Sequence, residues 1–311
     1  RFRFMADAAR RVGANWETGV TTTVEFRHAT MLRWIFENSP LAGRRDLSIF
    51  GVGIGLMPLV LPRGRHSPFF SEPLEMLATL ARRGTVRYLD LERHTVDAVN
   101  EFRRTGRMLT LSIEEMGQLS DLLRSPTGTA VLRAMGFPPS DTGSVQAQGY
   151  HMVDVPWVID QMKAAGVGFL SHPAGHPARG ASSELVFPEP LSQRLEAVLG
   201  DLVLDELPLG TADFAPALVT FLYIPKEFKE LAITRWAGVP RPGGLVAVTN
   251  ADTVGRVEDR VFRTLGLERL PTLTALDPPN QVTLYRRPEK PLPLLDELIL
   301  LIEDLLRETR A

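Results

Sequence analysis

The sequence predicts an α/β fold, a doubly wound and mostly parallel sheet, and two observations support that prediction. Short apolar runs alternate with helical patterns over residues 46–104 and again over 191–288. This alternation favours parallel strands joined by crossover helices. The first apolar run, residues 47–50, leads into glycines at positions 51, 53 and 55. Glycine permits a tight turn and lets a ligand approach the backbone closely.

Length and composition exclude several classes of protein. A chain of 311 residues has room for one large domain with an insertion, or for two domains. The net charge of −2 gives no electrostatic reason to expect a nucleic acid or a membrane as partner. The sequence has no cysteine, which excludes disulfides, thiolate metal sites and cysteine nucleophiles. No secretory signal and no membrane-length apolar run is visible, so a cytoplasmic protein is expected.

The first half of the chain begins with a helical pattern at residues 5–39, followed by the strand at 47–50. Ser71 as cap and Pro73 in the first turn predict a helix at 71–83. A strand at 86–90 and a helix at 95–104 complete this part of the α/β pattern.

Residues 105–190 interrupt the alternation, and we expect them to form an inserted, largely helical subdomain. Its predicted helices span 113–124, 128–135 and 155–165. We expect the insertion to emerge near the ligand crevice and to act as a lid, with residues 150–157 facing inward. Core packing is the alternative for Trp157. His172 and His176 lie in a loop without a helical face, so no metal site is predicted.

The α/β pattern resumes with strands at 195–201, 214–222 and 240–250, interleaved with helices at 226–237 and 254–265. Two further strands, 272–276 and 281–286, read as a hairpin at the sheet edge. The sheet therefore has seven predicted strands. The chain ends in an apolar helix at 292–308, whose wide apolar face is either buried within the chain or pairs with a second copy in a homodimer.

Acidic residues follow two of the strands. Asp90 ends the second strand, at the edge where open α/β sheets bind ligands, and its carboxylate suits ribose hydroxyls. Glu92 is a rival for the same role, and a surface turn residue is the other interpretation. Asp201 ends the third strand, where a carboxylate suits the exocyclic amine of adenine; a turn residue is again the alternative. The fourth strand delivers Thr220 and Tyr223 to the same crevice.

The glycine spacing argues against one class of enzyme. A dinucleotide-binding fingerprint reads G-x-G-x-x-G and would need glycine at position 56, where Leu56 stands. No Tyr-x-x-x-Lys pair is present either. A nicotinamide-dependent oxidoreductase is therefore the less favoured interpretation.

The order of these features resembles class I S-adenosylmethionine (SAM)-dependent methyltransferases. The resemblance covers roughly residues 45–104 and 195–287, and Pro242-Gly-Gly-Leu-Val-Ala-Val-Thr-Asn250 is its most specific piece. It implies a Rossmann-like fold with SAM as cofactor. The residues it implies as cofactor-binding are Gly51, Gly53 and Gly55 near the methionine moiety, Asp90 and Leu91 near the ribose, Asp201 and Leu202 near the adenine, and Thr220 near the methyl group. Tyr223, His151 and Asp154 are the candidate catalytic bases.

Within that superfamily the chain is similar to the chemotaxis-receptor glutamate methyltransferases, which also carry N-terminal helices and an inserted subdomain. It reads Gly55-Leu56-Met57-Pro58 where those enzymes carry Gly-Glu-Glu-Pro, and Ile49 stands where many class I enzymes keep an acid.

Two functions remain open: methyl transfer to a small-molecule or protein side-chain acceptor held between the sheet edge and the insertion, or a non-catalytic binding or scaffold protein. The predicted units are 1–45 (N-terminal helices), 46–104 and 191–288 (SAM-binding domain), 105–190 (substrate or lid insertion) and 289–311 (C-terminal helix).

Overall fold

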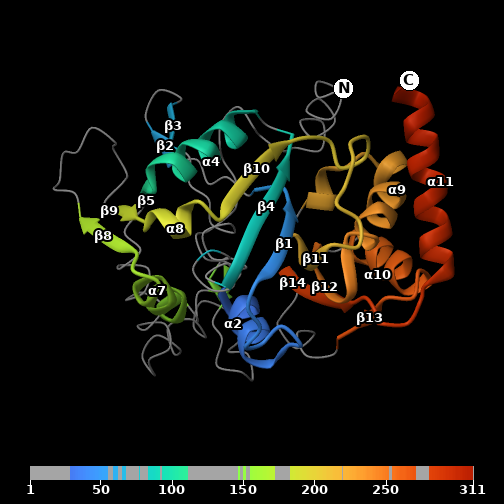
Figure 1. The fold of residues 1–311 in the computed structure, drawn as a ribbon, viewed down its shortest axis with the longest axis horizontal. Coiled ribbons are helices and arrows are strands. Elements are labelled where there is room, and N and C mark those ends of the chain that lie inside the picture. Colours follow the sequence, from blue (N-terminus) through green and yellow to red (C-terminus); the bar gives the residue numbers. More distant parts are fainter. Residues whose placement is uncertain are drawn as a thin grey trace.

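A seven-stranded sheet forms the centre of the protein (Figure 1). The computed structural model describes residues 29–54, 59–61, 65–67, 77, 83–91, 93–110, 146–147, 150–151, 155–171, 183–218, 220–251, 254–270 and 280–310. In spatial order the strands are β10 (Leu195–Leu199), β4 (Gly84–Asp90), β1 (Leu47–Val52), β11 (Ala212–Ala217), β12 (Pro240–Ala251), β14 (Asn280–Arg286) and β13 (Glu268–Arg269).

The strand order separates this sheet from the dinucleotide-binding arrangement. Strands β10, β4, β1, β11 and β12 are parallel, whereas β14 is antiparallel to both of its neighbours. In chain order the sheet reads third, second, first, fourth, fifth, seventh, sixth. The dinucleotide order ends fourth, fifth, sixth. The predicted seven-stranded, mostly parallel sheet is confirmed, although the predicted strand at 272–276 lies outside the described residues.

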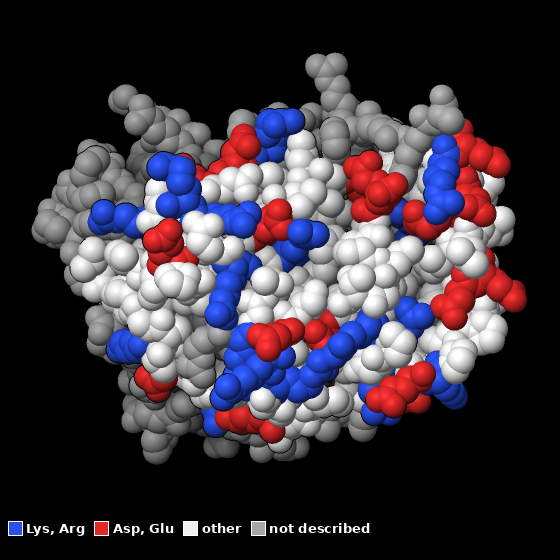
Figure 2. Space-filling view, in the orientation of Figure 1, with Lys and Arg blue, Asp and Glu red and all other residues white. Residues whose placement is uncertain are grey.

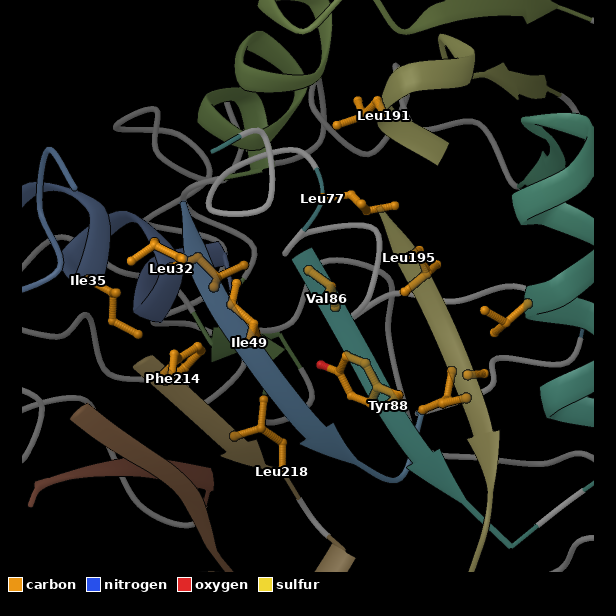
Figure 3. Packing of buried hydrophobic residues seen from close by; sticks show 14 of the residues in the cluster. Leu32, Ile35, Ile49, Leu77, Val86, Tyr88, Leu191, Leu195, Phe214 and Leu218 are labelled. Carbon is orange, nitrogen blue, oxygen red and sulfur yellow. The ribbon is translucent and has the colours of Figure 1, made fainter. Parts of the chain in front are cut away.

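Helices cover both faces of the sheet, as a doubly wound fold requires. Successive residues of a strand point to opposite faces, so Ile49 and Phe50 belong to two different cores. The Ile49 side, seen in Figure 3, packs on α2 (Ala29–Asn38), α4 (Arg93–Thr105), α7 (Val155–Ala164) and α8 (Glu189–Ser192). The Phe50 side packs on α9 (Lys226–Ala237), α10 (Val254–Thr264) and α11 (Pro293–Arg310).

The insertion contains strands that the sequence did not predict. A three-stranded antiparallel sheet is formed by β5 (Arg107–Thr110), β9 (Ser183–Val186) and β8 (Gly168–Ser171). Two short hairpins are also present, one before the insertion and one within it. The hairpin strands are β2 (Leu59–Leu61) with β3 (Arg65–Ser67), and β6 (Gln146–Ala147) with β7 (Tyr150–His151). The predicted helix at 155–165 is confirmed as α7, and those at 113–124 and 128–135 lie outside the described residues.

The insertion joins the sheet at the edge opposite the glycine loop. Helix α4 carries the chain back from the end of β4, so β5 begins at the amino-terminal edge; β9 returns through α8 (Glu189–Ser192) to the start of β10. Trp157 packs edge-on against Phe36, with ring centroids 5.8 Å apart, and the Arg83 guanidinium lies 4.5 Å from the Phe36 ring centroid. Arg83 immediately precedes β4, whose length of about 20 Å separates it from the carboxyl edge.

The prediction that residues 150–157 face the crevice is therefore wrong for Trp157. Its side chain packs against the core of the Ile49 face, as the alternative interpretation held. The physical reason is the path of α4, which crosses the sheet before the insertion begins. Figure 1 shows α7 beside α2, in agreement with the contacts between these two helices.

The C-terminal helix α11 is buried on one face only. Leu295 and Ile299 pack into the core on the Phe50 side together with α9. Leu294, Leu300, Leu301 and Leu305 are exposed. The prediction that α11 is buried within the chain is thus correct for the side that carries Leu295 and Ile299.

Arg235 of α9 is fully buried and joins three parts of the chain. Its guanidinium donates to the backbone oxygens of Leu202 (2.7 Å) and Asp205 (2.6 Å) and to the Glu303 carboxylate of α11 (2.7 Å). A buried cation is tolerated only when it is paired and hydrogen-bonded. Arg235 therefore fixes the turn after β10 and the C-terminal helix against the same side chain.

Replacement Arg235→Ala should lower the free energy of unfolding by about 3–5 kcal/mol, because it leaves Glu303 and two carbonyl groups without their donor. The matched control is Arg260→Ala, whose partner Glu230 is exposed, with both side chains 63% accessible. Such a surface pair contributes about 0–1 kcal/mol. Urea unfolding followed by circular dichroism measures both, and equal losses would contradict the structural role of Arg235.

Glu258 of α10 is a second buried ionisable group. It is 1% exposed, and its Oε2 has no hydrogen-bond partner among the described residues. Burial raises the pKa of Glu258 to about 8, and the positive charge of Lys229 on α9 acts in the opposite direction. Burial also lowers the pKa of Lys229.

Stability should therefore fall as the pH rises from 5 to 8. The pKa of Glu258 is about 8 in the folded protein, against about 4.3 in an unfolded chain, so the folded state binds the extra proton in this window. The slope reaches at most about 1.4 kcal/mol per pH unit. Glu258→Gln should flatten the profile, whereas Glu230→Gln, at an exposed site, should not. An unchanged slope in Glu258→Gln would exclude this group as its source.

Candidate functional site

The candidate site lies at the carboxyl edge of the parallel strands, where β1 and β11 diverge. From β1 the chain proceeds to one side through β4 and β10, and from β11 to the other side through β12. In open α/β sheets, ligands bind outside the carboxyl ends of the strands at such a switch point. The structure brings the ends of β1, β4, β10 and the turn after β11 together at this edge.

Gly51 and Gly53 are required for different reasons. A Cβ at Gly51 would lie 2.4 Å from the ring of Tyr88, so packing in the core demands glycine there. Gly53 has a φ of +71°, and a Cβ would lie 2.6 Å from Thr220 Oγ1. The Gly53 N–H donates to the backbone oxygen of Leu89 (3.0 Å). Gly53 is therefore the glycine that lets the loop turn closely at the crevice, while Gly55 lies outside the described residues.

Asp90 connects this loop to the end of β4. The Ile54 N–H donates to Asp90 Oδ2 at 2.8 Å, and the Gly200 N–H donates to the Asp90 backbone oxygen at 2.9 Å. Asp90 is half-buried. A carboxylate has about four acceptor positions, and the Ile54 N–H occupies one of those of Asp90. The ribose role of Asp90, and with it that of half-buried Leu91, stays a prediction.

Asp201 closes the turn after β10 and is fully buried. Its Oδ1 accepts the N–H groups of Val203 (2.7 Å) and Leu204 (3.3 Å), the contacts of an Asx turn. Its own N–H donates to Asp205 Oδ2 at 2.7 Å. Burial raises the pKa of the Asp201 carboxyl, and the two N–H groups oppose that shift.

The other carboxylate oxygen of Asp201, Oδ2, has no hydrogen-bond partner within the described part of the chain. The interpretation of Asp201 as a turn residue therefore accounts for the contacts of Oδ1. The adenine role, which needs an oxygen that can accept from a ligand, stays a prediction. Leu202 is also buried, in the core on the Phe50 side.

Thr220 lies at the crevice by a route the sequence did not predict. The strand expected to extend to residue 222 ends at Ala217, and a 3-10 turn, η2 (Thr220–Tyr223), follows it. The Thr220 hydroxyl donates to the backbone oxygen of Val52 at 2.7 Å, so it holds the end of β1. Tyr223 belongs to the same turn.

The remaining predicted catalytic residues are not placed by this geometry. For His151 the structure describes only the backbone, in β7, and Asp154 lies outside the described residues. The described residues bring together Gly51, Gly53, Asp90, Leu91, Asp201, Leu202 and Thr220, all at or next to the ends of the central strands.

Sequence reasoning missed Asp205 and Arg235, which hold the Asp201 turn by hydrogen bonds to its backbone. A second acid four residues after Asp201 was the available signal, because it permits a side chain to accept the N–H of the first. Nothing in the sequence near Arg235 pairs it with a turn 30 residues away.

Within the described ranges, no group of three or more histidine, aspartate or glutamate side chains could hold a metal ion. Nor does any helix in those ranges combine the length and apolar character needed to cross a membrane.

Comparison with known proteins finds similarity in three dimensions only. No family description matches the sequence, and no curated protein sequence does. Solved structures that match include the N-methyltransferase NodS of Bradyrhizobium japonicum in complex with S-adenosyl-L-homocysteine, at 10% identity and a TM-score of 0.44, covering 92% of this chain and 99% of NodS.

Two further matches are a TehB-like SAM-dependent methyltransferase of Corynebacterium glutamicum and the magnesium protoporphyrin IX methyltransferase of Synechocystis with bound SAM. The first has 11% identity, a TM-score of 0.39 and coverage of 92% and 97% of the two chains. The second has 9% identity, a TM-score of 0.39 and coverage of 90% and 89%. The predicted seven-stranded, mostly parallel sheet is borne out by the strand order and the antiparallel β14 of this structure itself.

The tight turn at Gly53 can be tested by adding one methyl group. Gly53→Ala should destabilise the protein more than Gly43→Ala, by about 1–3 kcal/mol for the overlap with Thr220. Gly43 is the matched control because its φ is also +71° and a Cβ there meets nothing within 4 Å. Both variants carry the same backbone strain of about 1–2 kcal/mol.

Thermal unfolding of the two variants measures the difference. Relative to Thr220→Ala alone, which loses the hydrogen bond to Val52, the double variant Gly53→Ala/Thr220→Ala should show little of the extra loss, because the hydroxyl that the new Cβ would meet is gone. If the two single variants lose equal stability, Thr220 does not constrain the loop.

Proposed function

We propose that this protein transfers a methyl group from SAM to an acceptor at the carboxyl edge of its sheet. The contact that carries the proposal is the hydrogen bond from Ile54 N–H to Asp90 Oδ2 at 2.8 Å. It joins a glycine loop to a carboxylate at the end of a strand, at the switch point of the sheet. This combination resembles the SAM site of class I methyltransferases. The seven-strand order with an antiparallel β14 supports the same class over the dinucleotide-binding one.

The residues at this edge fit an adenosine-containing cofactor. The absence of a side chain at Gly53 lets a ligand approach the backbone, and the Asp90 carboxylate suits vicinal ribose hydroxyls. When bound, SAM supplies an electrophilic methyl group on a sulfonium centre. The chain contributes alignment of the acceptor.

A general base is needed only for an acceptor that must lose a proton. Of the three candidates, Tyr223 belongs to the turn after β11 at this edge, three residues from Thr220. Tyr223 is therefore our proposed base, and His151 and Asp154 are the less favoured candidates. The acceptor, a small molecule or a protein side chain, would lie beside η2 rather than under α7.

The non-catalytic alternative is favoured by Ile49, Leu56 and Met57, which are apolar where polar ligand contacts are expected; Leu56 and Met57 lie outside the described residues. Ile49 is 1% exposed and pairs with Val86 and Phe214 in the middle of the sheet. Its apolar side chain is what packing against α2 requires at that position. Ile49 therefore does not count against cofactor binding at the strand ends.

Calorimetric titration with SAM and with S-adenosyl-L-homocysteine tests the proposal. The wild-type chain should bind both, and Asp90→Ala should weaken binding by about 1–3 kcal/mol, the range for a hydrogen bond to a charged group. The control is Glu189→Ala, an exposed acid of α8 at the opposite edge of the sheet, which should leave the affinity unchanged.

Asp90→Asn keeps an oxygen for the Ile54 N–H while it removes the negative charge, so it separates support of the loop from the proposed ribose contact. Circular dichroism confirms that each variant is folded. Absence of heat with either ligand in the wild-type chain would sink the proposal, and equal affinity in folded Asp90→Ala would remove Asp90 from the site.

A further inference from the structure

Helix α11 carries most of the large apolar side chains that the described part of the chain exposes. Six such side chains are exposed in the described ranges, and four of them belong to α11: Leu294, Leu300, Leu301 and Leu305. Three of these four, together with half-buried Leu298, are spaced four, three and four residues apart, so they share one side of the helix. We call residues 294, 298, 301 and 305 the leucine stripe. Figure 1 shows α11 at the outer margin of the molecule, and apolar side chains grouped in this way mark an interaction surface.

The leucine stripe is complementary to a second copy of itself. Its spacing of four, three and four residues reads the same in both directions along the helix. Two antiparallel copies therefore place Leu294 of one opposite Leu305 of the other, and Leu298 opposite Leu301. Leucines at this spacing pack as the layers of a short coiled coil, and an interface that uses the same patch on both chains closes as a twofold dimer. We propose that two copies of this protein associate through the leucine stripe as an antiparallel pair of α11 helices.

Charged residues near the two ends of α11 favour the antiparallel orientation. Exposed Lys290 lies just before the helix, and exposed Glu308 lies in its last turn. An antiparallel pair brings Glu308 of each copy to the end at which the other copy carries Lys290. Glu268, an acid within the same chain, is hydrogen-bonded by Arg286 at 2.5 Å. A parallel pair would instead bring like charges together at both ends, where they repel.

Acidic residues on one border of the stripe are compatible with this pairing. Figure 2 shows acidic side chains gathered along the margin that α11 occupies. Exposed Glu297 and Asp304 each precede a stripe leucine, so the antiparallel pair brings Glu297 of one copy towards Asp304 of the other. Asp304 already accepts a hydrogen bond from Arg307 of its own helix at 2.8 Å. Glu297 therefore meets an ion pair without net charge. The same acids disfavour a negatively charged lipid surface as the occupant.

The size of the contact predicts a weak dimer. A helix of 18 residues is about 27 Å long. A single pair of such helices lies at or below the lower limit of about 1,200 Å² for stable interfaces, in the range of transient complexes. We therefore expect a dissociation constant of about 1–100 μM.

Analytical ultracentrifugation of the full-length chain tests the association. The average mass should rise above the monomer value of 34.5 kDa as the concentration increases. Leu301→Glu should weaken the association about tenfold or more, because it places a charge in the centre of the stripe. The matched control is Leu300→Glu, since Leu300 is 65% exposed but lies outside the stripe, and it should leave the association unchanged. A chain that stays monomeric at about 200 μM would overturn the proposal, as would equal effects of the two substitutions.

Cysteine pairs test the orientation, because the chain has no cysteine of its own. Leu294→Cys and Leu305→Cys are prepared as separate chains and oxidised with oxidised glutathione, alone and mixed. The antiparallel pair places the two different cysteines opposite each other, so the mixture should form a covalent heterodimer about tenfold faster than either chain forms a homodimer. In either chain alone the two identical cysteines lie about 16 Å apart along the helix axis, whereas the Cα atoms of a disulfide lie within about 7 Å.

Two results would overturn the antiparallel dimer. Fast homodimers in each chain alone would show a parallel pair, and equal rates in all three samples would show only random collision. Circular dichroism confirms that each variant, altered only at an exposed leucine, is folded.

Discussion

The parallel register of β10, β4, β1 and β11 is the constraint on which the candidate site depends. Leu199 pairs with Asp90, and Val52 pairs with Leu89, so the strands end at one level. Both faces of these strands are covered by helices. A shift of one residue would move every buried side chain to the other face, and the burial of two cores therefore fixes where Asp90 and Gly53 stand.

The three glycines of the first loop illustrate why a motif needs its structural context. Gly51 lies inside β1 and makes room for the Tyr88 ring, a packing requirement that any protein with this core would have. Gly53 is different, since its positive φ forms the turn itself and Thr220 leaves no room there for a Cβ. The spacing alone could not distinguish these two causes. The hydrogen bond between the Asp90 carboxylate and the loop is consequently a stronger argument for a ligand site than the glycine spacing is.

Much of the central sheet could be predicted because its strands are apolar on both faces and separated by helical patterns. The strand ends could be predicted for the same reason, which placed Asp90 and Asp201 correctly at the carboxyl edge. The insertion could not. Its strands β5, β8 and β9 are four residues long, too short to show an alternating pattern. Trp157 meets Phe36 from 121 positions away, and no local signal reports that contact.

The turn that carries Asp201 is held by buried Arg235 of helix α9, which lies more than 30 positions later in the chain. An apolar side chain of similar volume would fill the same space without the cost of desolvating a cation. It would, however, leave the backbone oxygens of Leu202 and Asp205 without the donors they now have. Glu303 completes the arrangement from α11. The side of α11 that faces α9 therefore supports the turn through Glu303 and Arg235.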